Sequence, residues 1–377
     1  MRRKTGYRLV AGVAAVVATA SLVVAATHSR DVEGAPAPQP DARLARVPDC
    51  GPVIAGLDLR AQLAQLVVVG VPGSDPASTV KLVQDHQLGG IFIAGDATEL
   101  LTNQALDAVQ KAAKVPVSVA VDEEGGRVQR IDTLDGSIPS ARELAATRTP
   151  EQVREVAAQR GKQLRARGVT VDYAPDADIT DQPAHEAIGD RSFSGDPERA
   201  RLYVRAFAAG LRDAGVFPVL KHFPGHGHAS GDSHTGLVRT PPLPELRRVD
   251  LVPYQRITEY GPIGVMVGHL DVPDLTGGLP ASLSAPAYQL LRTEFGFTGP
   301  VVTDDLGAMK AITEQFPLPE AVLKALQAGA DEALWSSGGH VDQVLDRLSQ
   351  AVRTGELPEP RVRESLTRVL TAKGLCG

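Results

Sequence analysis

Eight short apolar runs, separated by stretches with helical periodicity, constrain the fold of this 377-residue chain more than any other feature. Each run is short, rich in Val, Ile and Ala, and typical of a buried strand. Strands that alternate with helices pair in parallel, and eight such units predict a single (β/α)8 barrel. A doubly wound open sheet is the alternative. The runs lie at residues 66–70, 90–94, 117–122, 169–174, 217–220, 264–269, 300–304 and 332–335.

Polar residues at the carboxyl ends of these runs favour the barrel. In a barrel these ends meet at one mouth, whereas in an open sheet they spread along an edge. Helical patterns at 78–86, 100–113, 150–167, 196–214, 285–294 and 318–328 supply the outer layer, and a pair of helices fits after Gly338. We therefore expect one catalytic domain over residues 51–377. The residues that end the runs are Asp122, Asp172, Lys221, His222, His269 and Asp304.

The N-terminus has the pattern of a targeting segment. Arg2, Arg3 and Lys4 precede residues 9–26, which carry no charge and are mostly Ala, Val and Leu. Such a segment is a signal peptide or an uncleaved membrane anchor over residues 1–26. A Pro- and Ala-rich linker is expected over residues 27–50. Both interpretations place the globular part outside the cytoplasm, secreted or at the outer face of the membrane.

Two cysteines stand at the ends of the predicted domain. Cys50 opens it and Cys376 is one residue from the end of the chain. In an oxidising compartment such cysteines can pair, and a closed barrel brings its first and last elements together. We expect a Cys50–Cys376 disulfide; two free thiols are the alternative.

Charge and composition exclude one class of partner. The formal net charge is −6, and no basic stripe with interleaved aromatic residues is present, which argues against nucleic-acid binding. Aromatic residues make up only 4% of the chain, so an aliphatic core is expected.

The most concentrated chemistry is the segment from Lys221 to His234, which holds four of the nine histidines. It begins at a strand end with Lys221-His222 and continues through a Gly-rich loop. Within the loop, Asp232 and His234 are spaced so that the carboxylate can orient the imidazole for proton transfer near neutral pH. The alternative is a pair of exposed turn residues.

Carboxylates and an arginine on other loops complete the candidate site. Asp304 follows a strand and can act as a nucleophile, while its neighbour Asp305 is expected to be structural, for example as a helix N-cap. Asp122 can accept hydrogen bonds from hydroxyl groups. Arg191 is a candidate donor, although a buried arginine often pairs with a core carboxylate instead.

Four segments together resemble the glycoside hydrolase family 3 β-N-acetylglucosaminidases of the NagZ type. The most specific is Lys-His-Phe-Pro-Gly-His-Gly at residues 221–227, followed by Asp-Ser-His at 232–234. The others are Val-Asp-Glu-Glu-Gly-Gly-Arg-Val-Gln-Arg at 121–130, Gly-Asp-Arg-Ser-Phe at 189–193 and Val-Thr-Asp-Asp-Leu at 302–306. The resemblance covers residues 57–373. Thr303, Gly268 and Asp190 are mild departures from the usual pattern.

This resemblance implies a retaining β-N-acetylhexosaminidase that removes non-reducing terminal β-linked GlcNAc, most plausibly from peptidoglycan turnover products. Asp304 is then the nucleophile, and His234 paired with Asp232 is the acid/base on a loop made flexible by Gly225, Gly227 and Gly231. The positions that match the sugar-binding residues are Asp122, Arg191, Lys221 and His222, with His269 facing the same mouth. We expect a monomer that acts on carbohydrate without a cofactor or metal.

Three other functions remain open. Because a histidine acid is neutral once it has given up its proton, phosphate in place of water as acceptor would make the enzyme a phosphorylase. His226-Gly227-His228 with His269 and Asp304 could instead form a metal site, although a His-x-His pair is expected at a strand tip rather than inside a loop. A non-catalytic glycan-binding protein is the third, but it would be expected to lack the nucleophile or the His–Asp pair.

Overall fold

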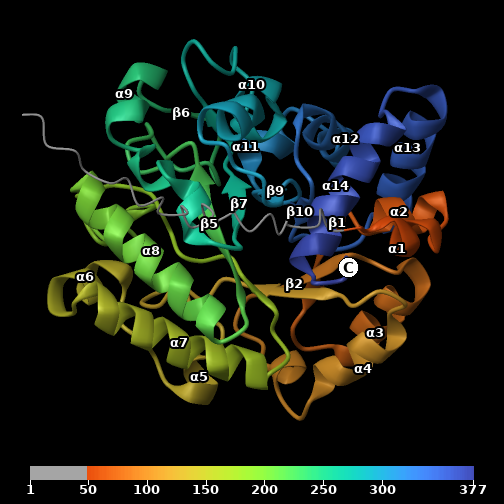
Figure 1. The fold of residues 1–377 in the computed structure, drawn as a ribbon, viewed down its shortest axis with the longest axis horizontal. Helices are drawn as coiled ribbons and strands as arrows, with labels where there is room; N and C mark the ends of the chain where they lie inside the picture. Colours follow the sequence, from red (N-terminus) through yellow and green to blue (C-terminus); the bar gives the residue numbers. More distant parts are fainter. Residues whose placement is uncertain (1–48) are drawn as a thin grey trace, which may run out of the picture. The chain divides into compact units, whose positions relative to one another are not determined.

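Eight parallel strands form the centre of the computed structural model, which describes residues 49–377. Each strand overlaps one of the eight predicted apolar runs, and Figure 1 shows helices packed around the strands. The strands are β1 (Val67–Pro72), β2 (Gly90–Ala94), β3 (Ser118–Val121), β4 (Val171–Asp172), β5 (Phe217–Phe223), β7 (Gly264–Val267), β9 (Val301–Thr303) and β10 (Ala333–Trp335).

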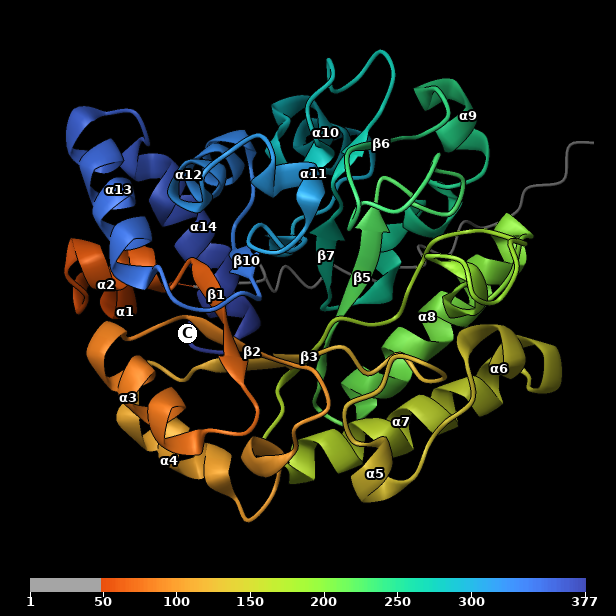
Figure 2. The ribbon, with the colours of Figure 1, turned by 180° about the vertical axis from the view of Figure 1, so that it is seen from behind.

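The sheet curves until its two edge strands, β10 and β9, lie next to each other. Its order is β10-β1-β2-β3-β4-β5-β7-β9, and a parallel bridge between Val302 and Glu332 joins β9 to β10. The backbone N–H of Thr303 donates to the carbonyl of Glu332 across this junction at 3.1 Å. The (β/α)8 barrel is therefore confirmed, and the doubly wound alternative is wrong. Figure 2 shows the strands encircled by helices from the opposite side.

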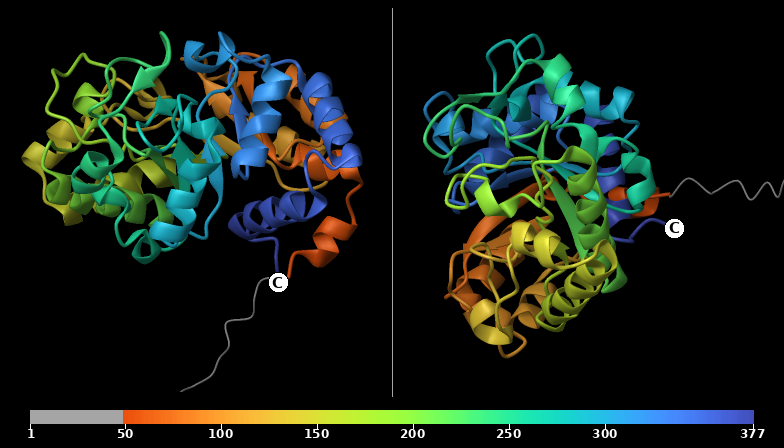
Figure 3. Two further views of the ribbon diagram at one scale, coloured as in Figure 1. Left: turned by 90° about the horizontal axis from the view of Figure 1, so that it is seen from above. Right: turned by 90° about the vertical axis from the view of Figure 1, so that its left-hand side faces the viewer.

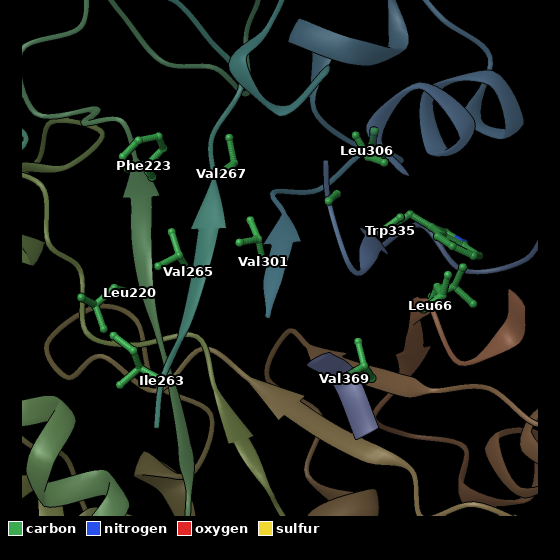
Figure 4. Close-up of a cluster of buried hydrophobic side chains, with 14 of the residues drawn as sticks. Leu66, Leu220, Phe223, Ile263, Val265, Val267, Val301, Leu306, Trp335 and Val369 are labelled. Atoms are coloured by element: carbon green, nitrogen blue, oxygen red, sulfur yellow. The ribbon is translucent and has the colours of Figure 1, made fainter. Parts of the chain in front are cut away.

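One side chain from each strand or its end fills the inside of the barrel. Successive residues of a strand point to opposite faces, so the residues on either side of these pack outward against the helices. Figure 4 shows part of that outward packing, with Val265 on β7 and Val301 on β9 among the labelled side chains. The inner layer consists of Val68, Phe92, Ala120, Tyr173, Val219, Met266, Val302 and Leu334.

The helices begin where the sequence supplies caps. Asp75, Thr149 and Asp196 each accept a hydrogen bond from a backbone N–H of the first helical turn, and a proline follows each of them. The helices are α1 (Gly51–Ala55), α2 (Leu59–Ala64), α3 (Pro76–His86), α4 (Ala105–Ala112), α5 (Asp132–Asp135), α6 (Ala141–Thr147), α7 (Pro150–Ala166), α8 (Pro197–Asp213), α9 (Leu243–Arg248), α10 (Ala285–Gln289), α11 (Lys310–Thr313), α12 (Leu318–Ala328), α13 (Val341–Thr354) and α14 (Glu359–Ala372).

Three predicted elements have different limits. The helix expected over 100–113 is interrupted, because Asn103 and Gln104 adopt left-handed conformations before α4 begins. The strand expected over 169–174 shortens to Val171–Asp172, and the one expected to end at Leu220 continues to Phe223. The extension carries Lys221 and His222 on the strand itself, so a rigid element rather than a loop positions both side chains.

Two further strands lie beyond the barrel and shape its mouth. β6 (Val238–Arg239) and β8 (Leu270–Asp271) pair in parallel. They join the loop that follows β5 to the loop that follows β7. Arg239 donates to Asp271 at 2.9 Å and reinforces this connection. Figure 3 gives two further views of the loops and helices around the barrel.

A cavity of about 640 Å³ opens at the amino-terminal ends of the strands. Val68, Val219 and Val302 of the inner layer form its apolar wall, and the last turn of α14 borders it. The Lys373 ammonium donates there to the Gln65 side chain and to the carbonyls of Gly89 and Pro116, at 3.1, 2.7 and 3.0 Å. The inner layer separates this cavity from the mouth.

The two ends of the described chain are joined covalently. Cys50 and Cys376 form a disulfide, as predicted, and the backbone N–H of Asp49 donates to the carbonyl of Gly377 at 2.8 Å. Cys50 is buried against α14, so the folded unit already includes the last residue of the expected linker. The predicted leader over residues 1–26 lies outside the described residues. Between residues 49 and 377, every helix is too short or too polar to cross a bilayer.

Removing the disulfide should destabilise the barrel without changing its site. It closes a loop of 326 residues, and cross-links of this kind typically contribute about 2–5 kcal/mol. We expect the double variant Cys50→Ser/Cys376→Ser to unfold at a lower urea concentration than the wild type. Reductant should lower the urea midpoint of the wild type but not that of the double variant. Equal midpoints for the oxidised wild type and the double variant would contradict this expectation.

Candidate active site

The mouth of the barrel is built on a chain of alternating charges. Lys221 Nζ, on β5, lies 2.6 Å from Asp122 Oδ1 and 2.6 Å from Glu124 Oε1, both in the loop after β3. Arg191 then donates to both oxygens of Glu124, at 2.8 and 2.9 Å, and approaches Asp176 at 3.4 Å. The structure thus brings together three of the four predicted sugar-binding residues.

Glu124 was missed by the sequence analysis although it links two of these residues. Burial opposes its ionisation, but Arg191 and Lys221 outweigh that effect and hold the pKa of the Glu124 carboxyl well below its usual range. The only sign of Glu124 in the sequence was its place in the Asp-Glu-Glu-Gly-Gly segment. Arg191 therefore pairs with a buried carboxylate. This is the alternative that the sequence left open beside a role as a donor to a ligand. Arg191 also lies at the border of the mouth.

Arg130 is a second residue that the sequence analysis did not select. Its guanidinium Nη2 lies 3.9 Å from Asp122 Oδ2. Its buried Nε has no hydrogen-bond partner among residues 49–377. Arg130 thus lies beside Asp122 at the mouth. Its only signal in the sequence was its place in the Arg-Val-Gln-Arg end of the same segment.

The strand-end carboxylate Asp304 lies at the tip of β9, partly open to the mouth. The backbone N–H of Asp305 donates to its Oδ1 at 2.8 Å. Burial acts to raise the Asp304 pKa, but nearby His269 and His222 and this N–H outweigh it, so the pKa lies below the usual value. The group is ionised at neutral pH, as a nucleophile requires.

Asp305 is structural, but not as the helix N-cap suggested by the sequence. Its Oδ1 accepts from the backbone N–H groups of Gly307 and Ser336, at 2.8 and 2.9 Å, and its Oδ2 accepts from the Ser336 hydroxyl. Helix α11 begins only at Lys310, and Met309, which makes no side-chain capping bond, occupies its N-cap position. Asp305 therefore ties the end of β9 to the residue after β10 and fixes the position of its neighbour Asp304.

His269 is fully buried, and both of its ring nitrogens are engaged. Nδ1 lies 2.7 Å from Ser282 Oγ, and Nε2 lies 2.9 Å from the carbonyl oxygen of Asp305. Burial lowers the pKa of the imidazole, so the ring is neutral near pH 7. With both nitrogens bonded to protein groups, His269 is placed to hold Asp305 rather than to contact a ligand directly.

Asp232 and His234 form the hydrogen-bonded pair predicted from their spacing. Nδ1 of His234 lies 2.7 Å from Asp232 Oδ1, and the backbone N–H of His234 donates to the same oxygen at 2.9 Å. The hydrogen bonds and charge of His234 hold the Asp232 pKa below its usual value, although partial burial opposes the shift. Both side chains are exposed, at 69% for His234 and 39% for Asp232.

Two of the three glycines expected to make this loop flexible are instead packing positions. A Cβ at Gly225 would lie 2.4 Å from Asp250 Cβ, and one at Gly227 would lie 2.0 Å from the carbonyl oxygen of Ile179. Both residues therefore allow close contact between segments. Gly231 and Gly236 have more space, which confines any hinge to the second half of the loop.

The histidines of the proposed metal site have separate partners. His226 Nε2 lies 3.1 Å from Ser233 Oγ, and His228 Nδ1 lies 2.9 Å from Asp250 Oδ1. One other group, Asp176, Asp178 and His222, has ligand atoms within 4.8 Å of one another. In that group His222 Nδ1 and Asp178 Oδ2 already bond each other at 2.6 Å, and Asp176 faces Arg191. The donor atoms are thus arranged for hydrogen bonding.

A family model described as "Glycosyl hydrolase family 3 N terminal domain" matches residues 58–372. The chain belongs to glycosyl hydrolase family 3. This match spans the whole barrel and all the residues of the mouth, so the predicted family and the prediction of a glycoside hydrolase are confirmed.

Relatives at high identity agree with this membership. Beta-hexosaminidase LpqI of Mycobacterium tuberculosis is 50% identical over 382 residues, covering 96% of both chains. A crystal structure of a family 3 glycosyl hydrolase from Mycobacterium smegmatis is 53% identical, with a TM-score of 0.81 over 85% of this chain and 98% of that chain. A family 3 β-N-acetylglucosaminidase from Paenibacillus is 32% identical, with a TM-score of 0.79 over 85% of this chain and 62% of that one.

The Glu124 carboxylate is the group on which the charge network of this family 3 enzyme depends most. Glu124→Gln would leave Arg191 and Lys221 buried with less compensating charge, and removal of one partner of a buried pair typically costs about 3–5 kcal/mol. We expect a lower melting temperature and a KM raised about tenfold or more. Glu143→Gln makes the same change at an exposed position and should alter neither. A Glu124→Gln variant with wild-type stability and KM would contradict this role.

Proposed function

We propose that this enzyme is a retaining β-N-acetylglucosaminidase that hydrolyses non-reducing terminal β-linked GlcNAc, released chiefly during peptidoglycan turnover. The observation that carries the proposal is the His234–Asp232 hydrogen bond on a loop beside the mouth that holds Asp304. A histidine acid/base with its own carboxylate, facing an ionised aspartate, supplies the two groups that a retaining glycosidase needs. The names of the relatives support the choice of an N-acetylhexosamine substrate.

In the first step, an Asp304 oxygen attacks the anomeric carbon and forms an ester with it. The bond from that carbon to the leaving oxygen breaks, and the protonated His234 gives its Nε2 proton to this oxygen. Asp232 keeps the Nδ1 proton in place and stabilises the charged ring. The result is a glycosyl–Asp304 intermediate, a released alcohol and a neutral His234.

In the second step, neutral His234 removes a proton from water as the water oxygen attacks the anomeric carbon. The ester bond breaks, and Asp304 recovers its negative charge. The sugar leaves with the configuration it had in the substrate, because two inversions have occurred. Asp122, Lys221 and His222, with Arg191 behind them, hold the sugar hydroxyl groups through both steps.

Phosphate is a second candidate acceptor, and the proposed mechanism gives one reason to consider it. His234 is neutral when the acceptor arrives, whereas a carboxylate in its place would be negative and would repel an anion. With phosphate, its oxygen would attack the anomeric carbon and the product would be a sugar 1-phosphate. Hydrolysis remains the main proposal.

The enzyme is proposed to act as a monomer outside the cytoplasm, after secretion or while anchored through residues 9–26. The Cys50–Cys376 disulfide supports an oxidising compartment. Cys50 packs on the last turns of α14, which border the cavity at the amino-terminal ends of the strands.

Substitution of the two reacting groups should have different effects. Asp304→Ala should abolish turnover, because no covalent intermediate can form. His234→Ala should lower kcat by roughly 10²–10⁴, the usual range for loss of general acid–base catalysis. Steady-state kinetics on an aryl β-N-acetylglucosaminide measures both. Full activity in either variant would overturn the assignment.

The substrate and acceptor can be tested together by product analysis. We expect a strong preference for 4-nitrophenyl β-N-acetylglucosaminide over the matching β-glucoside. The released GlcNAc should be the β anomer before mutarotation. The same reaction in phosphate buffer, followed by NMR, identifies any sugar 1-phosphate. A preference for the glucoside would refute the proposed substrate, and dominant sugar phosphate would make the enzyme a phosphorylase.

A further inference from the structure

A buried carboxylate that was not among the predicted site residues connects the strand residue His222 to the loop that carries Asp232 and His234. Asp178 lies in the segment after β4 and is 1% exposed. Its Oδ2 lies 2.6 Å from Nδ1 of His222, and its Oδ1 accepts from the backbone N–H of His226 at 2.6 Å. The pKa of Asp178 falls to about 2, because His222, His226 and the hydrogen bonds to them outweigh the opposing effect of burial. The ionised carboxylate therefore accepts from both residues.

His226 continues this connection towards the acid/base loop. Its Nε2 lies 3.1 Å from the hydroxyl of Ser233, the residue between Asp232 and His234. Burial lowers the pKa of the His226 ring, so the ring is neutral and its Nε2 shares one hydrogen with the hydroxyl. A neutral ring can form this bond without placing a second charge beside the dyad.

Burial shows that Ser233 is the anchored residue of the loop. It is 1% exposed, whereas the Asp232 and His234 side chains on either side point to solvent. The carbonyl of Ser233 also accepts from the backbone N–H of Ala311 at 3.4 Å. The position of the exposed pair is therefore determined by the buried residue between them.

We propose that Asp178, His226 and Ser233 form a hydrogen-bonded relay that fixes the acid/base loop relative to the sugar-binding residues. Asp178 orients His222 towards the sugar with one oxygen and holds the start of the loop with the other. His226 carries that position to Ser233, and Ser233 sets where His234 stands. All three are positioning residues, and the inference rests on the proposed function because it takes His234 as the acid/base.

The relay acts on proton transfer and should therefore be visible in leaving-group dependence. An activated aryl leaving group departs without much help from an acid, whereas the alcohol of a sugar needs a proton. A misplacement of about 1 Å can cost as much as 10²-fold in rate. Loosening the loop should slow cleavage of a disaccharide far more than cleavage of an activated aryl glycoside.

Ser233→Ala tests this directly on the full folded chain. For N,N′-diacetylchitobiose we expect kcat to fall about tenfold or more, and for 2,4-dinitrophenyl β-N-acetylglucosaminide by less than about threefold, with unchanged KM. Ser233→Thr keeps the hydroxyl and should restore the disaccharide rate. Ser230→Ala makes the same change at an exposed position of the same loop and should leave both rates near the wild-type values. Equal losses on both substrates, or no loss, would refute the relay.

A double variant tests the connection to Asp178. Asp178→Asn cannot accept from both His222 and His226 in the same way, so it should reproduce the leaving-group dependence and lower the affinity for the sugar. If one relay joins the sites, Asp178→Asn/Ser233→Ala should lose no more disaccharide activity than Asp178→Asn alone. Multiplied losses would show that the two residues act independently.

His234→Ala separates failure of the relay from failure of the proposed function. If His234→Ala shows a strong leaving-group dependence and Ser233→Ala shows none, the relay is wrong and the acid/base assignment stands. If His234→Ala itself shows no dependence on the leaving group, the proposed function fails as well.

Discussion

The Glu124 carboxylate, held between Lys221 and Arg191, is the interaction on which the rest of the mouth depends. Two cations and a carboxylate buried together at 2.6–2.9 Å are stable only while every partner is present, since each alone would carry a large desolvation cost. The three residues come from the loop after β3, the segment before α8 and strand β5. Because the pairs are directional, they also fix where Asp122 and the sugar-binding side chains stand relative to one another.

That network requires a closed barrel. β3, β4 and β5 are neighbours in the sheet, so residues at their carboxyl ends lie within reach of one another without long loops. Closure through Val302 and Glu332 then brings β9, with Asp304 at its tip, round to the same mouth. The inner layer of one side chain per strand supports the ring from within. The strand pairing that closes the barrel therefore also brings the residues of the mouth together.

The sequence predicted the elements of the fold well because their signal is local. All eight strands follow apolar runs, and α3, α7 and α8 begin at Asp-Pro or Thr-Pro pairs. Candidate residues such as Asp122, Lys221 and Asp304 could be named because they end those runs. Glu124 and Asp178 could not, because their importance lies in partners distant in sequence, 67 residues for Glu124 and Arg191 and 44 for Asp178 and His222. His226 and Ser233 are only seven residues apart, but their bond depends on how the loop folds back on itself. A buried carboxylate shows its function only when its partners are known.

The histidine-rich segment therefore has three kinds of residue rather than the two that its sequence suggested. Lys221 and His222 stand on β5 at the proposed sugar site. His226 is buried and, with Ser233, connects the strand to the loop, while Gly225 and Gly227 allow the close packing that this requires. Only the last part, with Asp232 and His234, is open to solvent. A loop built in this way can expose the proposed acid/base and still hold it in place, because the residue between the two exposed groups is anchored beneath them.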